Sequence, residues 1–160
     1  FNSAARDICA HDPARLKSLC QVPLQDTDAA CAELDIAMAE GHIGVQIGNH
    51  VGDRNLDDAG IVTFLHHCAD VGAAVLIHPW DMMAQQRMPK YMMSWLVGMP
   101  AEQSRAACSL VFGGVLERLP KLKICMAHGG GSFPYTIGRI EHGFDMRPDL
   151  VATDNFRHRP

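Results

Sequence analysis

The stretch AAVLIHPWDM, residues 73–82, decides the fold class, because an apolar run ends there in a histidine and is then stopped by a proline. About fifty positions later KICMAHGGG, residues 123–131, repeats the construction with glycines after the histidine. Short apolar runs closed by residues that turn the chain are typical of buried β-strands. Each of these two strands therefore carries one histidine, His78 or His128, at its carboxyl end.

Two further strands are predicted upstream, over SLCQVPL at residues 18–24 and over HIGVQIG at residues 42–48. Helical patterns lie between and after the strands. Asp28 is a plausible N-cap for the first of them, and Ile61, Phe64, Leu65 and Cys68 give the spacing of a second that ends at Gly72.

A long helical region follows, in which Pro100 suits a first helical turn and Gly113 and Gly114 weaken the helix or allow close packing. SFPYTIGRIEHGF, residues 132–144, predicts one more helix.

Strands that alternate with helices predict an α/β fold with a parallel sheet. No G-x-G-x-x-G motif and no phosphate-binding P-loop follows a strand, so a dinucleotide fold has little support. Four strands are about half of a (β/α)8 TIM barrel, which typically takes about 250 residues. We therefore expect residues 1–160 to form one partial barrel domain, roughly strands three to six. Because the chain starts at Phe1 and not at methionine, we also expect it to be a piece of a longer protein.

Composition narrows the class of protein. Apolar residues make up 48% and charged residues 20% of the chain, with a formal charge of −4, which is ordinary for a globular domain and argues against nucleic acid as a partner. No apolar stretch approaches the roughly 20 residues of a membrane span, and the start lacks a signal-peptide layout. The 6 cysteines form no C-x-x-C pair, so we expect free thiols and a cytoplasmic location.

Chemistry in barrels of this type collects at the carboxyl ends of the strands, where His78 and His128 are expected. Neutral imidazoles there suit a divalent metal such as zinc, or proton transfer near neutral pH. The alternative is a strand-end histidine that bonds a nearby loop carbonyl. His50 is a weaker candidate in a strand-end loop, and His42 lies at the opposite, structural end of its strand.

Longer segments carry a more specific signal: HPWDM, KYMMSWLVGMPAE, GGVLERLPKLKICMAHGGGSFPYTIGRIEHGF and MRPDL. They closely resemble the aminocarboxymuconate-semialdehyde decarboxylases, metal-dependent enzymes of the amidohydrolase superfamily that act in the kynurenine route of tryptophan degradation. The resemblance is strong over residues 73–155 and weaker over residues 32–58.

The resemblance implies a Zn2+-dependent decarboxylase of a small dicarboxylate semialdehyde, working as a homodimer. It implies that His78 is a zinc ligand and His128 the catalytic acid or base. Arg139 would reach across the dimer interface to a substrate carboxylate, and Trp95 would line the substrate pocket. From the residues alone, Arg139 could instead pair with Glu141 or Asp145 on a helix surface, and Trp95 could be a core aromatic.

The resemblance also leaves gaps. The family's H-x-H pair on strand one, the substrate-binding arginine after it and the metal-binding aspartate on strand eight have no counterpart here, and we expect them before Phe1 and after Pro160. Two other functions stay open, a metal-dependent hydrolase of the same superfamily and a catalytically inactive half-barrel that acts as an interaction module.

Overall fold

The computed structural model describes residues 1–151, so the last four residues of the resembling stretch, 152–155, lie outside the described residues. The chain divides into two compact units. The first contains residues 1–47, 58–77 and 119–125, and the second contains residues 48–57, 78–118 and the chain from Met126 onward. Each unit is described below by itself.

The first unit is built on a three-stranded sheet in the order β1 (Gly44–Ile47), β2 (Ala74–Ile77) and β3 (Lys123–Met126). Strands β1 and β2 run parallel, with Gly44 opposite Ala74 and Ile47 opposite Ile77. Parallel pairing needs a long crossover, and α3 (Ala59–Val71) supplies it. The predicted α/β class with parallel strands is therefore confirmed.

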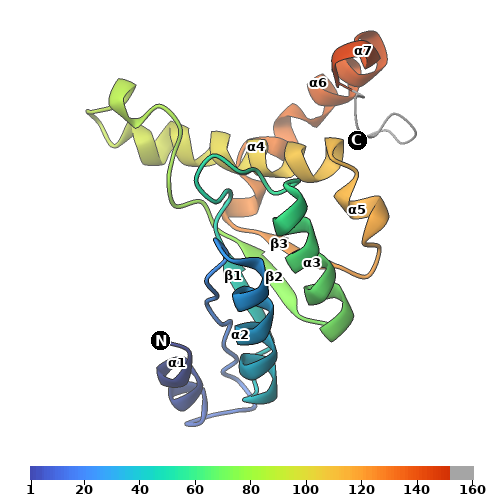
Figure 1. The fold of residues 1–160 in the computed structure, drawn as a ribbon. Helices are drawn as coiled ribbons and strands as arrows, with labels where there is room; N and C mark the ends of the chain where they lie inside the picture. The colour runs from blue at the N-terminus through green and yellow to red at the C-terminus, as the bar shows by residue number, and fades with distance from the viewer. Residues whose placement is uncertain (152–160) are drawn as a thin grey trace. The chain divides into compact units, whose positions relative to one another are not determined.

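Two helices pack together in this unit, α2 (Thr27–Ala39) and α3, while α1 (Asn2–Cys9) lies near the N-terminus (Figure 1). The inward faces of these helices and the strands form an apolar core with side chains at most 1% exposed: Cys20, Leu34, Val45, Ile61, Phe64, Leu65, Cys68 and Val75. The predicted face of α3 is thus the buried one. Gly72 ends α3 with φ of +74°, a left-handed conformation that glycine adopts without strain.

The strand predicted over residues 18–24 is wrong. Only Cys20 pairs with the sheet, through one parallel bridge to Val45. Its backbone N–H donates to the Gly44 carbonyl at 2.8 Å, and its carbonyl accepts from Gln46 at 2.9 Å. The ladder does not continue because the chain turns: the Val22 carbonyl accepts from the Leu24 N–H at 3.0 Å, and the Pro23 carbonyl accepts from the Asp26 N–H at 2.9 Å.

The predicted N-cap of α2 is also wrong, by two residues. Asp26, not Asp28, precedes the helix, and its side chain accepts a 3.0 Å hydrogen bond from the Ala29 N–H. Asp26 has the extended backbone that an N-cap needs, with φ of −122° and ψ of 110°, whereas Asp28 already lies inside the first turn.

The second unit is helical. A 3-10 turn η1 (Gln85–Arg87) precedes a π-helical turn η2 (Ser94–Gly98), which continues into α4 (Met99–Phe112) with Pro100 in its first turn, as predicted. Helix α4 ends before Gly113 and Gly114, so these glycines do interrupt the helix, and α5 (Val115–Arg118) follows.

The rest of the second unit packs against α4. A short turn η3 (His128–Gly130) and helix α6 (Phe133–Met146) both contact α4, and α7 (Pro148–Val151) contacts α6. The helix predicted over residues 132–144 is confirmed by α6. Among residues 1–151, no helix combines the length and apolar character that crossing a membrane requires.

Candidate active site

His78 and His128 are brought together, as predicted. His78 directly follows β2, and His128 follows β3 with one residue between. Their Nε2 atoms are 3.2 Å apart, and the rings meet edge to face with centroids 4.9 Å apart and planes inclined by 62°. His78 is half-buried and His128 is exposed. The pair therefore presents ring nitrogens that a small molecule or ion can reach.

The contact between the rings tests the alternative that each strand-end histidine bonds a nearby loop carbonyl. Within the part of the chain that is described, neither imidazole bonds a loop carbonyl, and each ring is bonded to the other. A hydrogen bond between the two Nε2 atoms requires one of them to carry the hydrogen and the other to accept it. The pair is thus suited to holding or moving one proton, or to binding one ion.

The donor set fits part of a zinc site. A neutral imidazole nitrogen is a common zinc ligand, and the Nε2 atom of His78 lies 3.2 Å from that of His128. Among the described residues, no group of three or more His, Cys, Asp and Glu side chains could hold a metal. His78 can supply one such ligand with His128 beside it, and the described residues do not complete a four-coordinate site.

The backbone of His128 is left-handed, with φ of +53°. Residues with a Cβ avoid this region, and exceptions cluster at functional sites, where the surrounding structure enforces them. Here the loop from Ala127 to Ser132 is fixed against the start of α4. The Gln103 side chain donates to the Ala127 carbonyl at 2.9 Å, and the Ser132 N–H donates to the Pro100 carbonyl at 3.2 Å.

Two more features hold this loop to α4. The Ser104 and Ser132 hydroxyls bond each other at 2.6 Å. A Cβ on Gly131 would lie 2.5 Å from the Pro100 carbonyl oxygen and 2.7 Å from Cβ of Gln103, so only glycine allows the backbone to approach this closely. The loop that carries His128 therefore rests directly on the helix.

The next residues of α4 hold the loop that follows β1. Glu102 is 2% exposed, and its Oε2 accepts from Asn49 Nδ2 at 2.6 Å and from Arg105 Nη2 at 2.6 Å and Nε at 2.9 Å. Arg105 also donates to Asn55. The buried carboxylate is thus balanced by a cation and a donor, as burial of a charge requires.

Sequence reasoning missed Gln103 and this Glu102 cluster. Most polar residues of a helix face water, so the sequence alone does not distinguish the few that are buried. The signal that could have indicated the cluster is the spacing of Glu102 and Arg105, three residues apart on one helix face.

His50, the weaker candidate, is not used at the histidine pair. Its Nδ1 faces the Gly52 carbonyl oxygen at 2.7 Å, and its Nε2 faces the Asp81 carbonyl oxygen at 3.0 Å. The ring therefore connects the loop after β1 to the loop after β2. His42, expected on the structural side, is buried at 3% exposure.

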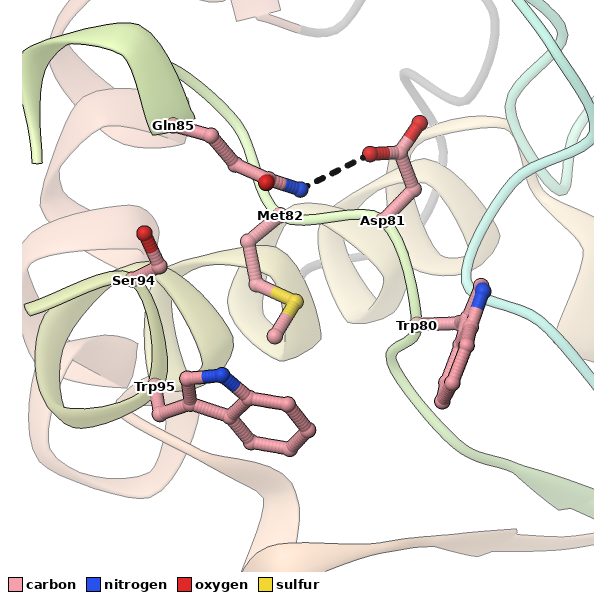
Figure 2. A pocket seen from close by; sticks show the side chains of 6 residues that line it. All are labelled: Trp80, Asp81, Met82, Gln85, Ser94 and Trp95. Carbon is pink, nitrogen blue, oxygen red and sulfur yellow. Dashed lines mark hydrogen bonds between the residues drawn. The ribbon is translucent and has the colours of Figure 1, made fainter. Parts of the chain in front are cut away.

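Trp95 lines a pocket of about 370 Å³. Figure 2 shows the Met82 side chain pointing toward the Trp95 indole, while Gln85 donates to the Asp81 carboxylate at 3.0 Å. Trp80 and Ser94 complete the lining. Trp95 is 48% exposed, so it is not a core aromatic, and its indole is available to a flat ligand.

Arg139 lies on α6 and is exposed. A pair with Glu141 or Asp145 on the helix surface stays the alternative role. Its proposed contact with a substrate across a dimer stays a prediction.

The chain belongs to the amidohydrolase family, whose sequence profile matches residues 1–155. Over 156 residues it is 50% identical to a 2-amino-3-carboxymuconate-6-semialdehyde decarboxylase of Dictyostelium discoideum, a match that covers 97% of this chain and 44% of that protein. The chain thus spans less than half the length of this relative.

Solved structures share the fold. The 5-carboxyvanillate decarboxylase of Sphingomonas paucimobilis superposes with a TM-score of 0.88 at 24% identity, covering 99% of this chain and 49% of that chain. The dihydroxybenzoic acid decarboxylase of Polaromonas sp. JS666, solved with bound manganese and the inhibitor 2-nitroresorcinol, gives a TM-score of 0.78 at 21% identity, covering 99% of this chain and 50% of that chain.

Proposed function

We propose that this chain is part of a zinc-dependent decarboxylase of 2-amino-3-carboxymuconate 6-semialdehyde that acts in tryptophan degradation. The observation that carries the proposal is the 3.2 Å contact between His78 and His128, in a chain half identical to a decarboxylase of that name. The architecture we propose is a partial (β/α)8 barrel, and the superposition on other decarboxylases supports it.

In this proposal His78 is a metal ligand and His128 the proton carrier. A bound divalent metal supplies Lewis-acid stabilisation of negative charge. Loss of carbon dioxide breaks a carbon–carbon bond and leaves an electron pair on the substrate carbon, which must receive a proton. His128 is exposed and can deliver a proton there or take one from water, a role that typically contributes about 10²–10⁴ in rate.

Substrate recognition is assigned to Arg139 and Trp95. The planar guanidinium of arginine can bind both oxygens of a carboxylate, and Arg139 is exposed for such a contact from a second copy of the protein. The Trp95 indole offers a flat apolar wall for the conjugated substrate. A homodimer is therefore part of the proposal, as is a cytoplasmic location, which the 6 free cysteines support.

The test uses the full-length protein that contains this chain. We expect it to consume the semialdehyde, which an absorbance assay measures, and to release one molecule of carbon dioxide for each molecule of substrate. Removal of metal with a chelator should abolish the reaction, and zinc should restore it. Hydrolysis of a lactone or an amide in place of decarboxylation would favour the hydrolase, and no reaction with either substrate class would favour the inactive interaction module.

A further inference from the structure

We propose that Gln103 is a positioning residue for His128. It acts through the Ala127 carbonyl, to which its side-chain Nε2 donates at 2.9 Å. The inference rests on the proposed function for its catalytic consequence, although the positioning itself can be measured without activity. Gln103 is fully buried in α4, so its amide comes from a rigid element.

The geometry of the peptide bond makes this contact specific for His128. The Ala127 carbonyl and the His128 N–H belong to one planar peptide unit. Rotation of that plane changes φ of His128 and therefore the direction of its Cα–Cβ bond and imidazole. By holding the carbonyl oxygen, the Gln103 amide fixes φ at its observed +53°.

The Ala127 carbonyl accepts two hydrogen bonds. One comes from the Gly130 N–H at 3.1 Å and closes the turn of η3, while the Gln103 side chain supplies the other. The turn bond lies within the loop and moves with it. The Gln103 bond instead ties the same oxygen to α4, which resists movement of the loop as a whole.

The far end of the loop is fixed separately. Ser132 bonds the Pro100 carbonyl through its N–H and its hydroxyl, each at 3.2 Å, and Gly131 lies against the same helix turn. With this end held, loss of the Gln103 bond leaves the loop attached but frees the peptide that precedes His128. We therefore expect the catalytic step to suffer more than substrate binding.

The kinetic test uses Gln103→Met and Gln103→Glu in the full-length protein. Met has similar length and no donor, so kcat should fall by about 10- to 100-fold while KM changes less than threefold. Glu cannot donate when ionised but can when protonated. The ratio of its kcat to that of the wild type should therefore rise as pH is lowered, whereas the ratio for Gln103→Met should stay flat. Gln86→Glu adds the same charge at an exposed position and should leave kcat unchanged.

The second readout is the imidazole itself. In protein labelled with ¹³C-histidine, the His128 ring resonances, assigned with His128→Asn, should shift or broaden in Gln103→Met while those of His66 on α3 do not. Circular dichroism checks that each variant is folded. If folded Gln103→Met leaves the His128 resonances unchanged, the positioning role is wrong whatever happens to kcat. If the wild type shows no decarboxylation, the proposed function fails, and the resonances still decide the positioning role.

Discussion

His128 combines an exposed imidazole with a left-handed backbone, a conformation that costs an ordinary L residue about 1–2 kcal/mol. The contacts with α4 offset this cost. The histidine is thus held where its ring meets that of His78, which is the arrangement that a shared proton or a shared ion requires.

The roles of the two histidines can be separated by asparagine substitutions. In the full-length protein, His128→Asn should lower kcat by about 10²–10⁴ with zinc content unchanged, because the proposed proton carrier is lost while asparagine tolerates the left-handed backbone. His78→Asn should lower zinc content as well as activity, both measured with elemental analysis and the decarboxylation assay.

His66→Asn is the matched control, since His66 is an exposed helical histidine paired with Asp70. It should leave both quantities unchanged. Equal zinc loss in His78→Asn and His128→Asn would contradict the assignment of one ligand and one proton carrier.

At the residue scale, the sequence predicts the histidine pair because each histidine ends a short apolar run, and such a run predicts a strand. The proposed role of Gln103 could not be predicted, since it depends on which backbone carbonyl lies next to the buried face of α4. The left-handed backbone of His128 is equally hidden, because it is enforced by the contacts of the loop with α4 and not by the histidine itself.

Helix α2 offers a test at the scale of an element. Asp26→Ala should lower the free energy of unfolding by about 1 kcal/mol, because the N-cap bond to Ala29 is lost. Asp28→Ala should cost less, since Asp28 loses only its interaction with the helix dipole. Urea denaturation of both variants in the full-length protein measures the difference, and a larger loss for Asp28→Ala would contradict the observed cap.

The errors at this scale have one physical origin. Two aspartates lie two positions apart before α2, and only the backbone conformation distinguishes a cap from a first-turn residue. In residues 18–24, an apolar composition predicts a strand, but the chain turns after Cys20 and only a single bridge forms. Helices α3 and α6 were predictable because their apolar spacing or flanking signals extend over several turns.

On the scale of the whole chain, the buried thiols should lower the free energy of unfolding at alkaline pH. Burial raises the pKa of Cys20 to about 11 and that of Cys68 to about 12, from 9.0. Above pH 9 the unfolded chain loses these protons while the folded chain keeps them. The unfolded state then binds fewer protons, so the free energy of unfolding falls as pH rises from about 9 to 12.

Urea denaturation between pH 8 and pH 11 measures this slope. Cys68→Ala should make it shallower, and Cys125→Ala, at an exposed thiol, should leave it unchanged. A slope that is the same in all three proteins would show that the buried thiols do not contribute to it.

Zinc affinity tests whether this chain by itself contains a metal site. The isolated 160-residue chain should bind zinc weakly and below one equivalent in equilibrium dialysis, and should turn over no substrate, because residues 1–151 supply two converging imidazoles and no larger ligand group. Tight, stoichiometric zinc in the isolated chain would contradict this expectation.

The three consecutive glycines after His128 are not equivalent, and this has a consequence for related sequences. Gly129 has φ of +63° and ψ of 22°, with nothing near its missing Cβ, so asparagine or aspartate could replace it at modest cost. Gly131 has φ of +63° and ψ of −128°, a region open only to glycine, and it also faces the Pro100 carbonyl. An alignment of decarboxylases that keep this loop should therefore show variation in the first letter of the triplet and none in the third.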